Sequence, residues 1–600
     1  MQLAFIDWLI IVLFFAVSIG IGIWASRSAG KSFKDYFLAG GKMSWWLLGV
    51  SMVATTFAAD TPGLVTQLVR QGGVSGNWAW WAFLLTGLLT VFVYAKLWKR
   101  SGVLTDLEFY ELRYGGKLGG FLRGFRAIYL GVVFNCMVMA VVVLAAIKLS
   151  GVLLGASPIT TVLVAGTVTV AYTFLGGLKG VILTDFFQFA IAMIGAVAAA
   201  IVLCDQPEIG GFSNLLAHKN VAGKLAILPD FSNSGILPLL IIPLAVQWWS
   251  SWYPGAEPGG GGYVAQRMLS AKSESDATAA TLFFQIAHYA LRPWPWIIVA
   301  LASLAVFPDL NSISAAFPEV DPSLLGDDIA YPAMLSRLPT GLLGLVIASL
   351  IAAFMSTIST HLNWGGSYVA HDFYGRFIKQ DASESELVWI GRASTIGLMV
   401  IASVLALFIQ SAGDGFNMIV QFGAGTGLIY ILRWFWWRVN AWSEIVGMAV
   451  STIVALIFVA TALPAEATEI EKAAAMQPWH KILIGVLITN AAWIAVTFLT
   501  RPSDQATLES FYQKVRPDGR GWEPIRRSLA DQGIDVQLDG SITSGVLAMV
   551  AATFLVYSLL FGVGYFLYGQ WIYAGISAAI AATAASAIIW IWPRLKMGNQ

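Results

Sequence analysis

The chain has 600 residues, of which 58% are hydrophobic and 12% are charged, about half the charged share of an ordinary soluble domain. Its 35 basic and 34 acidic residues nearly cancel, which excludes the concentrated positive charge that a nucleic-acid partner requires. Cys136 and Cys204 lie in apolar runs and support neither a disulfide framework nor a zinc site. This composition predicts an all-α polytopic membrane protein surrounded by a lipid bilayer.

Apolar windows of about 20 residues, long enough to cross the hydrocarbon core of a bilayer, recur along almost the whole chain. They run without period-two alternation, as expected for helices. We expect about 15 transmembrane helices, over residues 4–26, 45–69, 77–99, 122–152, 157–176, 181–204, 235–254, 277–306, 339–370, 387–411, 415–437, 441–463, 480–500, 543–567 and 571–593.

Basic residues gather on one side of these spans. Arg27, Lys31 and Lys34 follow the first span, as they do after an uncleaved anchor whose N-terminus lies outside. Alternation from that start leaves few basic residues on the outer side, namely Arg70, Lys219, Lys224, Arg337 and Lys472. The sequence thus predicts a multi-pass protein of the inner or plasma membrane, with the N-terminus outside and the C-terminus cytoplasmic.

Polar groups in the second span predict an interrupted helix. Asp60 is followed by Pro62 and Gly63, and a proline removes a backbone hydrogen bond. Backbone groups freed at this depth are tolerated only where protein encloses a cavity. A proline kink against a neighbouring helix is the alternative explanation of this segment.

The seventh span ends in a similar way. Pro243 precedes the polar, aromatic run 247–255, and four glycines follow at 259–262. Two interrupted apolar segments five spans apart indicate an inverted-repeat transporter with a binding site at the membrane midplane. Together they make simple kinks the weaker explanation.

The ninth span carries a cluster of hydroxyl groups. Ser356, Ser359 and Thr360 share one helix face, and Thr357 flanks them. Hydroxyl oxygens and free carbonyls are suitable ligands for a hard cation such as Na⁺. Hydroxyls in membrane helices also bond to their own backbone or join neighbouring helices, so both interpretations stay open.

Besides Asp60, other charged or titratable groups lie within or near the spans. Asp185 follows a glycine-rich turn, about one turn into the sixth span, where it either serves the helix N-terminus or faces the bundle interior. His288 and Arg292 lie in the eighth span. They are either partnered inside the bundle, by Asp60 or Asp185, or directed toward a membrane surface.

Four segments follow one another along the chain, namely Asp35–Gly40, Gly176–Gln188, Gln266–Lys272, and Ala353–Asn363 with Asp372 and Tyr374. Together and in this order they resemble the sodium:solute symporter family, which includes sodium–glucose, sodium–proline and sodium–sialic acid cotransporters. The similarity reaches from about residue 5 to about residue 460. A segment at 511–517 also looks like one found in some longer members.

The resemblance implies a leucine-transporter-type bundle, a five-plus-five inverted repeat, with one extra N-terminal and several extra C-terminal helices. On this basis we expect five parts. These are an extra helix and cytoplasmic loop at 1–44, the transport core at 45–437, accessory helices at 438–500, a cytoplasmic loop at 501–542 and a helix pair at 543–600. The oligomeric state stays open.

The resemblance also implies ion sites. A first Na⁺ would lie between the first and eighth core helices. Its ligands would be the carbonyls of Ala54, Phe57 and Ala353 and the hydroxyls of Ser356 and Thr357. Some members bind a second Na⁺, and the matching positions here are Asp185, Ser359 and Thr360.

The solute site departs from the family pattern. Sugar-transporting relatives place a carboxylate early in the second core helix, where this chain has Asn77. Candidate solute contacts come from segments expected to face the cavity, although a tryptophan in a membrane protein is more often a packing or interface residue. These candidates are Thr61, Asn77, Trp80, Gln247, Trp248, Trp252, Tyr253, His288 and Gln421.

These observations predict a sodium-coupled symporter that imports a small polar solute, a sugar or sugar derivative, by alternating access. The alternatives are an amino-acid, sugar-acid or vitamin symporter, a proton-coupled symporter and, more remotely, a non-transporting membrane sensor. The spans contain no constellation with the spacing of a metal site or an activated nucleophile, so we do not expect an enzyme.

Overall fold

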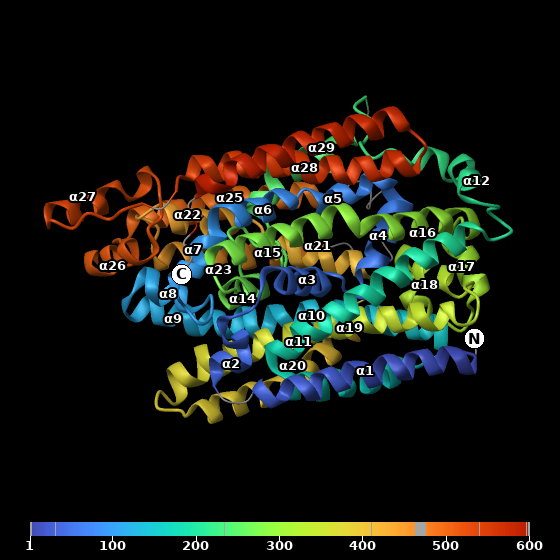
Figure 1. Cartoon of the computed structure of the whole chain (residues 1–600), viewed down its shortest axis with the longest axis horizontal. Helices are drawn as coiled ribbons and strands as arrows, with labels where there is room; N and C mark the ends of the chain where they lie inside the picture. Colours follow the sequence, from blue (N-terminus) through green and yellow to red (C-terminus); the bar gives the residue numbers. More distant parts are fainter. Residues whose placement is uncertain are drawn as a thin grey trace.

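The computed structural model describes residues 3–29, 32–232, 235–409, 411–461, 476–538, 540–595 and 597. Helices dominate this part of the chain, and its only extended pairing is an isolated bridge between Met43 and Ala271. Most of the long helices run side by side along the long axis of the molecule (Figure 1). Lys31, Lys472 and the last two residues of the expected span 441–463 lie outside the described residues.

Each expected span coincides with an apolar helix. Eleven helices in the described part of the chain are long and apolar enough to cross a membrane, and a bent pair at 415–435 makes a twelfth. The three remaining spans coincide with shorter apolar helices, Trp45–Thr56, Pro158–Ala171 and Leu237–Ser250. The eleven are Phe5–Trp24, Val74–Ser101, Gly116–Leu154, Gly177–Cys204, Glu274–Val306, Leu342–Ile378, Glu384–Ala406, Ala441–Ala460, Pro478–Leu499, Ile542–Leu567 and Trp571–Leu595.

The second span is broken. Helix α3 (Trp45–Thr56) ends before Phe57, and α4 (Thr61–Gly72) begins four residues after that residue. Pro62 lies in the first turn of α4, where the missing N–H has no helical partner to lose. The interruption therefore precedes the proline, and the expected helix break is present.

The seventh span is broken as well. Residues 237–247 form π-helical turns, and the short helix α13 (Trp248–Ser250) follows them. The chain is then irregular until α14 (Gly262–Ser270), with Gly255, Gly259 and Gly260 at positive φ. Glycine adopts this backbone conformation without steric cost, which explains the glycine-rich run.

The longest helix, α11 (Pro158–Cys204), joins the fifth and sixth spans and bends at Gly177, which has φ 55°. A Cβ atom at Gly177 would lie 2.8 Å from the carbonyl oxygen of Tyr36, so only glycine fits this bend. Helix α11 packs against α1 (Phe5–Ala29), α3 and α19 (Leu342–Ser367). It therefore lies against the first helix of the chain, the broken second span and the ninth span.

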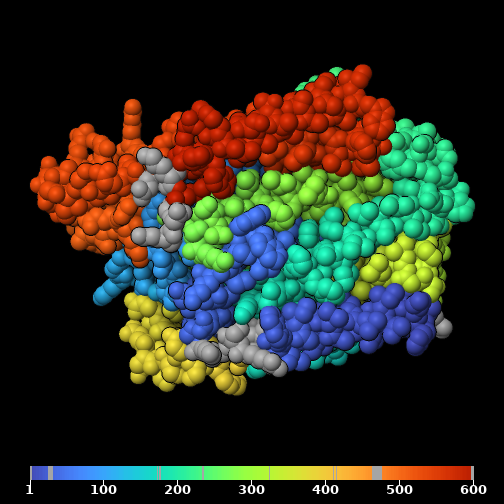
Figure 2. Space-filling view, viewed as in Figure 1, coloured from blue at the N-terminus to red at the C-terminus, as the bar shows by residue number. Residues whose placement is uncertain are grey.

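Other helices enclose these elements. In Figures 1 and 2, α28 (Ile542–Leu567) and α29 (Trp571–Ile591) run along one edge of the molecule, and α1 runs along the opposite edge. The remaining long helices are α10 (Asn135–Leu154), α15 (Glu274–Ile286), α16 (Pro293–Val306), α20 (Glu384–Ala406), α21 (Ala412–Gly423), α22 (Gly427–Phe435), α23 (Ala441–Ala460) and α25 (Pro478–Leu499).

The polar segment 501–542 folds onto the end of the bundle. It forms α26 (Gln505–Val515) and α27 (Glu523–Asp531), and α26 packs against α8 (Glu108–Tyr114). Buried Arg113 of α8 donates hydrogen bonds to four carbonyls at the end of α22, including Arg433 O at 2.8 Å and Val439 O at 3.1 Å. Its guanidinium also lies 4.9 Å from the ring centroid of Trp522.

We predict that Arg113→Lys lowers the stability of the folded protein by about 2 kcal/mol, because an ammonium group cannot reach four separate carbonyls and buried acceptors lose their donors. Thermal unfolding of the purified variant measures this loss. Arg516→Lys serves as a control in the same region. Equal unfolding temperatures for Arg113→Lys and the parent protein would contradict the prediction.

Candidate functional site

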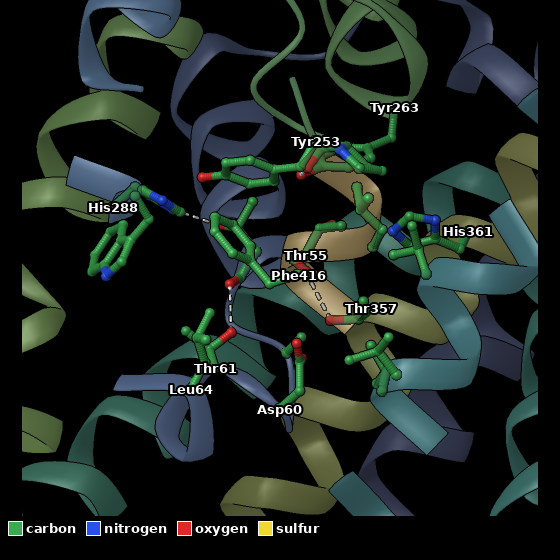
Figure 3. A pocket seen from close by; sticks show the side chains of 18 of the residues that line it. Thr55, Asp60, Thr61, Leu64, Tyr253, Tyr263, His288, Thr357, His361 and Phe416 are labelled. Atoms are coloured by element: carbon green, nitrogen blue, oxygen red, sulfur yellow. Dashed lines mark hydrogen bonds between the residues drawn. The ribbon is translucent and has the colours of Figure 1, made fainter. Parts of the chain in front are cut away.

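A central cavity of about 110 Å³ lies between the two helix breaks. Figure 3 shows side chains from both breaks and from α19 and α21 surrounding it, with the Asp60 carboxylate at one end and His288 on another side. Most of the wall is apolar or aromatic, with a few polar groups, as in small-molecule sites generally. Its polar and aromatic lining includes Thr55, Thr56, Asp60, Thr61, Trp80, Tyr253, Tyr263, His288, Arg292, Thr357, His361 and Phe416.

Four of the nine solute candidates line this cavity, namely Thr61, Trp80, Tyr253 and His288. The other five, Asn77, Gln247, Trp248, Trp252 and Gln421, are not among its lining residues.

Three of these five have structural contacts instead. Asn77 Oδ1 accepts a hydrogen bond from the Trp80 indole at 2.9 Å, so it orients a residue that does line the cavity. Gln247 donates to a backbone carbonyl of the second core helix at 2.8 Å. The Trp252 indole donates to Thr426 at 2.8 Å. These polar groups already have partners.

His288 and Arg292 are both inside the bundle. Thr56 Oγ1 accepts a hydrogen bond from Arg292 at 3.0 Å and lies 2.9 Å from His288 Nδ1. Among the described residues, no carboxylate oxygen lies within 4.0 Å of Arg292, so the expected ion pair with Asp60 or Asp185 is not present. Arg292 is 1% exposed, which also excludes the alternative that it extends to a membrane surface.

The cavity contains polar atoms that lack partners. Asp60 Oδ1 and Arg292 Nε are buried and have no hydrogen-bond partner among the described residues. Leaving a buried polar atom unpaired is costly, more so for a charged group. Both side chains line the cavity, so a bound solute could supply partners for both.

Asp185 lies at the centre of a second polar cluster. Asp185 lies more than two helical turns after Gly177. Its carboxylate oxygens accept hydrogen bonds from Ser51 at 2.5 Å and from Ser356 at 2.6 Å. The guanidinium of Arg267 lies 4.0 Å from Asp185. Asp185 therefore faces the bundle interior and does not serve a helix N-terminus.

The residues expected at the first Na⁺ site are partly brought together. Ala54, Phe57, Ala353 and Ser356 line one small hollow between α3, α11 and α19, to which α11 contributes Gln188, Phe189 and Ala192. Thr357 points elsewhere, because its hydroxyl donates to Thr55 O at 2.7 Å, as Figure 3 shows, and it lines the central cavity.

The residues expected at the second Na⁺ site are arranged differently. Thr360 Oγ1 accepts a hydrogen bond from Arg267 at 2.8 Å, so an arginine lies between the hydroxyl and Asp185. Ser359 donates to the carbonyl of Ser356 in its own helix at 3.1 Å, the alternative noted above for such hydroxyls. Ser51 and Arg267 were not among the site residues expected from the sequence, although Arg267 lies in one of the motifs that carry the family resemblance.

Comparison with known proteins settles the family. The sodium:solute symporter family is matched over residues 36–451, more than half of the chain. The chain belongs to the sodium:solute symporter family. It is thus a multi-pass membrane protein of a transporter family, and the resemblance inferred from the motifs is confirmed.

Two relatives illustrate the similarity. A sodium/glucose cotransporter of Vibrio parahaemolyticus is 26% identical over 473 residues, which cover 76% of this chain and 85% of the relative. Sodium/myo-inositol cotransporter 2 of Oryctolagus cuniculus is 26% identical over 564 residues, covering 85% of this chain and 79% of the relative.

A solved structure confirms the fold. The substrate-bound, outward-open structure of a Na⁺-coupled sialic acid symporter superposes with a TM-score of 0.65 at 20% identity, covering 84% of this chain and all of the other. The expected five-plus-five bundle is therefore confirmed.

We predict that Thr56→Val destabilises the solute-free protein by about 1–3 kcal/mol, because His288 and Arg292 lose a shared buried partner while the volume stays the same. The unfolding temperature in detergent measures the effect. Thr61→Val is the matched control, since the Thr61 hydroxyl makes only a long bond of 3.4 Å to Thr56 O. A Thr56→Val variant no less stable than Thr61→Val would contradict the prediction.

Proposed function

We propose that this protein is a secondary active symporter that couples Na⁺ entry to the import of a small polar solute, a sugar or sugar derivative. One observation carries the proposal. The last turn of α3 and the break after it contribute Ala54 and Phe57 to the small hollow and Thr55, Thr56 and Asp60 to the central cavity. One short segment of the chain therefore forms part of both sites.

This shared segment provides a physical basis for coupling. A cation held by the carbonyls of Ala54 and Phe57 and by Ser356 would join α3 to α19 and fix the conformation of the break. The solute would then meet a pre-organised wall, and by linkage the solute would raise the affinity for the cation equally. The membrane potential adds about 2.3 kcal/mol per charge for each 100 mV.

The cavity chemistry supports a sugar or polyol. Trp80 and Tyr253 supply flat apolar surfaces with polar edges, which suit a sugar ring. Asp60 offers a free carboxylate oxygen, which replaces the carboxylate that sugar-transporting relatives place near the position of Asn77. Proteins similar to this chain include a sodium/glucose, a sodium/mannose and a sodium/myo-inositol cotransporter.

Arg292 favours a second candidate, a sugar acid. Its Nε atom has no partner among the described residues, and its side chain lines the cavity. A solute carboxylate would give the guanidinium a charge-assisted hydrogen bond, which is stronger than one to a neutral hydroxyl.

For the ion, we predict that Ser356→Ala raises the half-saturating Na⁺ concentration of uptake by at least about 10-fold, a loss of about 1.4 kcal/mol of binding. Ser359→Ala, the same substitution in the same helix, should leave it nearly unchanged because that hydroxyl bonds its own backbone. Uptake by proteoliposomes over a range of Na⁺ concentrations measures both. Uptake driven by a proton gradient without Na⁺ would favour the proton-coupled alternative.

For the solute, we predict that Asp60→Asn weakens binding of a transported neutral sugar by about 10-fold or more, since a charged hydrogen bond contributes about 1.5–3 kcal/mol. A thermal-shift screen of sugars, sugar acids and amino acids, with and without Na⁺, identifies the ligand first. Gln421→Ala is the control, because Gln421 does not line the cavity. If Arg292→Gln abolishes binding while Asp60→Asn does not, the sugar-acid candidate is favoured.

A further inference from the structure

We propose that an acyl chain of a membrane lipid occupies a second cavity, separate from the solute site. This cavity has a volume of about 430 Å³ and lies between α1, α10, α11 and α19. It is much larger than the central cavity of about 110 Å³. α1, α10 and α19 belong to the helices long and apolar enough to span a membrane, and the part of α11 that lines the cavity is the shorter apolar helix Pro158–Ala171.

The lining accommodates hydrocarbon and little else. Its polar side-chain groups are four hydroxyls and the indole N–H of Trp8, which lies at the exposed end. Each hydroxyl already has a partner. Ser150 and Thr161 bond each other at 2.5 Å, Thr160 lies 2.8 Å from Ser157 Oγ, and Thr169 donates to Ala165 O at 2.8 Å. A buried water needs two to four polar partners, and a sugar needs more. Among the described lining residues, the hydroxyls are thus engaged and one indole N–H is too little for water or a polar solute.

The outer end of the cavity opens toward the lipid. Trp8, Leu154 and Val164 line it and are 49%, 37% and 60% exposed. Val12, one turn after Trp8 in α1, and Leu163, next to Val164 in α11, are exposed too. The opening is thus continuous with apolar helix surface, and in a bilayer the solvent of that surface is acyl chain.

The size of the cavity decides between apolar occupants. A helix with its side chains is about 10–12 Å in diameter. A volume of about 430 Å³ would therefore hold only about one turn of such a helix. A single flexible chain fits such a space. An empty space would deprive its lining atoms of van der Waals contacts, so occupation by a chain stabilises the surrounding packing.

The inner end of the cavity lies beside the break between α3 and α4 and beside α19. Ala59, in the break between α3 and α4, and Phe354 and Met355 of α19 line it and are buried. Phe354 and Met355 lie between Ala353 and Ser356, which line the small hollow. A bound chain would thus support α19 from the face opposite the ion, a consequence that rests on the proposed function, whereas the lipid site itself does not.

Photo-crosslinking tests the site without any transport measurement. The full-length protein is reconstituted in phosphatidylcholine vesicles that contain a phosphatidylcholine with a diazirine near the end of one acyl chain. After illumination, mass spectrometry maps the labelled peptides. We expect label on Ile347–Met355 of α19 as well as on the exposed face of α29. Label confined to outward faces, with Ile347–Met355 no more labelled than the buried helix α14, would overturn the proposal.

Two variants sharpen the test. Ala165→Phe places a ring in the cavity and should abolish labelling of Ile347–Met355 while α29 stays labelled. Ala582→Phe is the matched control, since Ala582 is exposed on α29 and away from the cavity, and it should leave the α19 label intact. Ala146→Leu replaces Ala165→Phe if that variant does not fold. If a variant that fills the cavity folds and α19 is labelled as strongly as in the parent protein, the proposal is also overturned.

Discussion

Asp185 is a carboxylate buried among membrane-spanning helices, where a charge without partners would cost several kcal/mol. Its partners come from three other helices, because Ser51 belongs to α3, Ser356 to α19 and Arg267 to α14. The positions of these helices relative to α11 therefore depend on one group. Since α3 and α14 each adjoin a helix break, the same cluster fixes one side of both breaks.

The charges near the core fall into two kinds. Asp185 and Arg267 have partners within the protein, and Arg267 also bonds Thr360 at 2.8 Å. Asp60 Oδ1 and Arg292 Nε have no hydrogen-bond partner in the described part of the chain, and both side chains line the central cavity. Charges of the first kind hold the bundle together, whereas those of the second kind are available to a ligand. This division explains why the eighth-span arginine is buried without a carboxylate beside it.

The spans and breaks could be predicted from the sequence because they depend on local properties. Apolar length sets each span, and Pro62 and the glycines at 259–262 mark the ends of irregular segments. Side-chain directions could not be predicted in the same way. Residues 237–247 form π-helical turns, which change the register of a helix, and Gln247 does not line the cavity although its segment was expected to face it.

For the hydroxyl residues expected at the Na⁺ sites, side-chain directions could not be predicted either. Spacing placed Ser356, Ser359 and Thr360 on one face of α19, but spacing does not determine which hydroxyl bonds its own backbone. In the structure Ser359 does so, while Ser356 bonds Asp185. The role of Arg267 could not be predicted from the sequence either, because its contact with Thr360 depends on how α14 follows the second break. Tertiary packing determines both the partners of the hydroxyls and the position of Arg267.

Three environments meet along helix α19. Ala353 and Ser356 line the hollow proposed for the ion, Thr357 lines the central cavity, and Phe354 and Met355 line the apolar cavity. Five consecutive residues cover well over one helical turn, so they must point in different directions. A shift or rotation of α19 would therefore change all three environments together, and its packing against lipid would influence the geometry available to the ion.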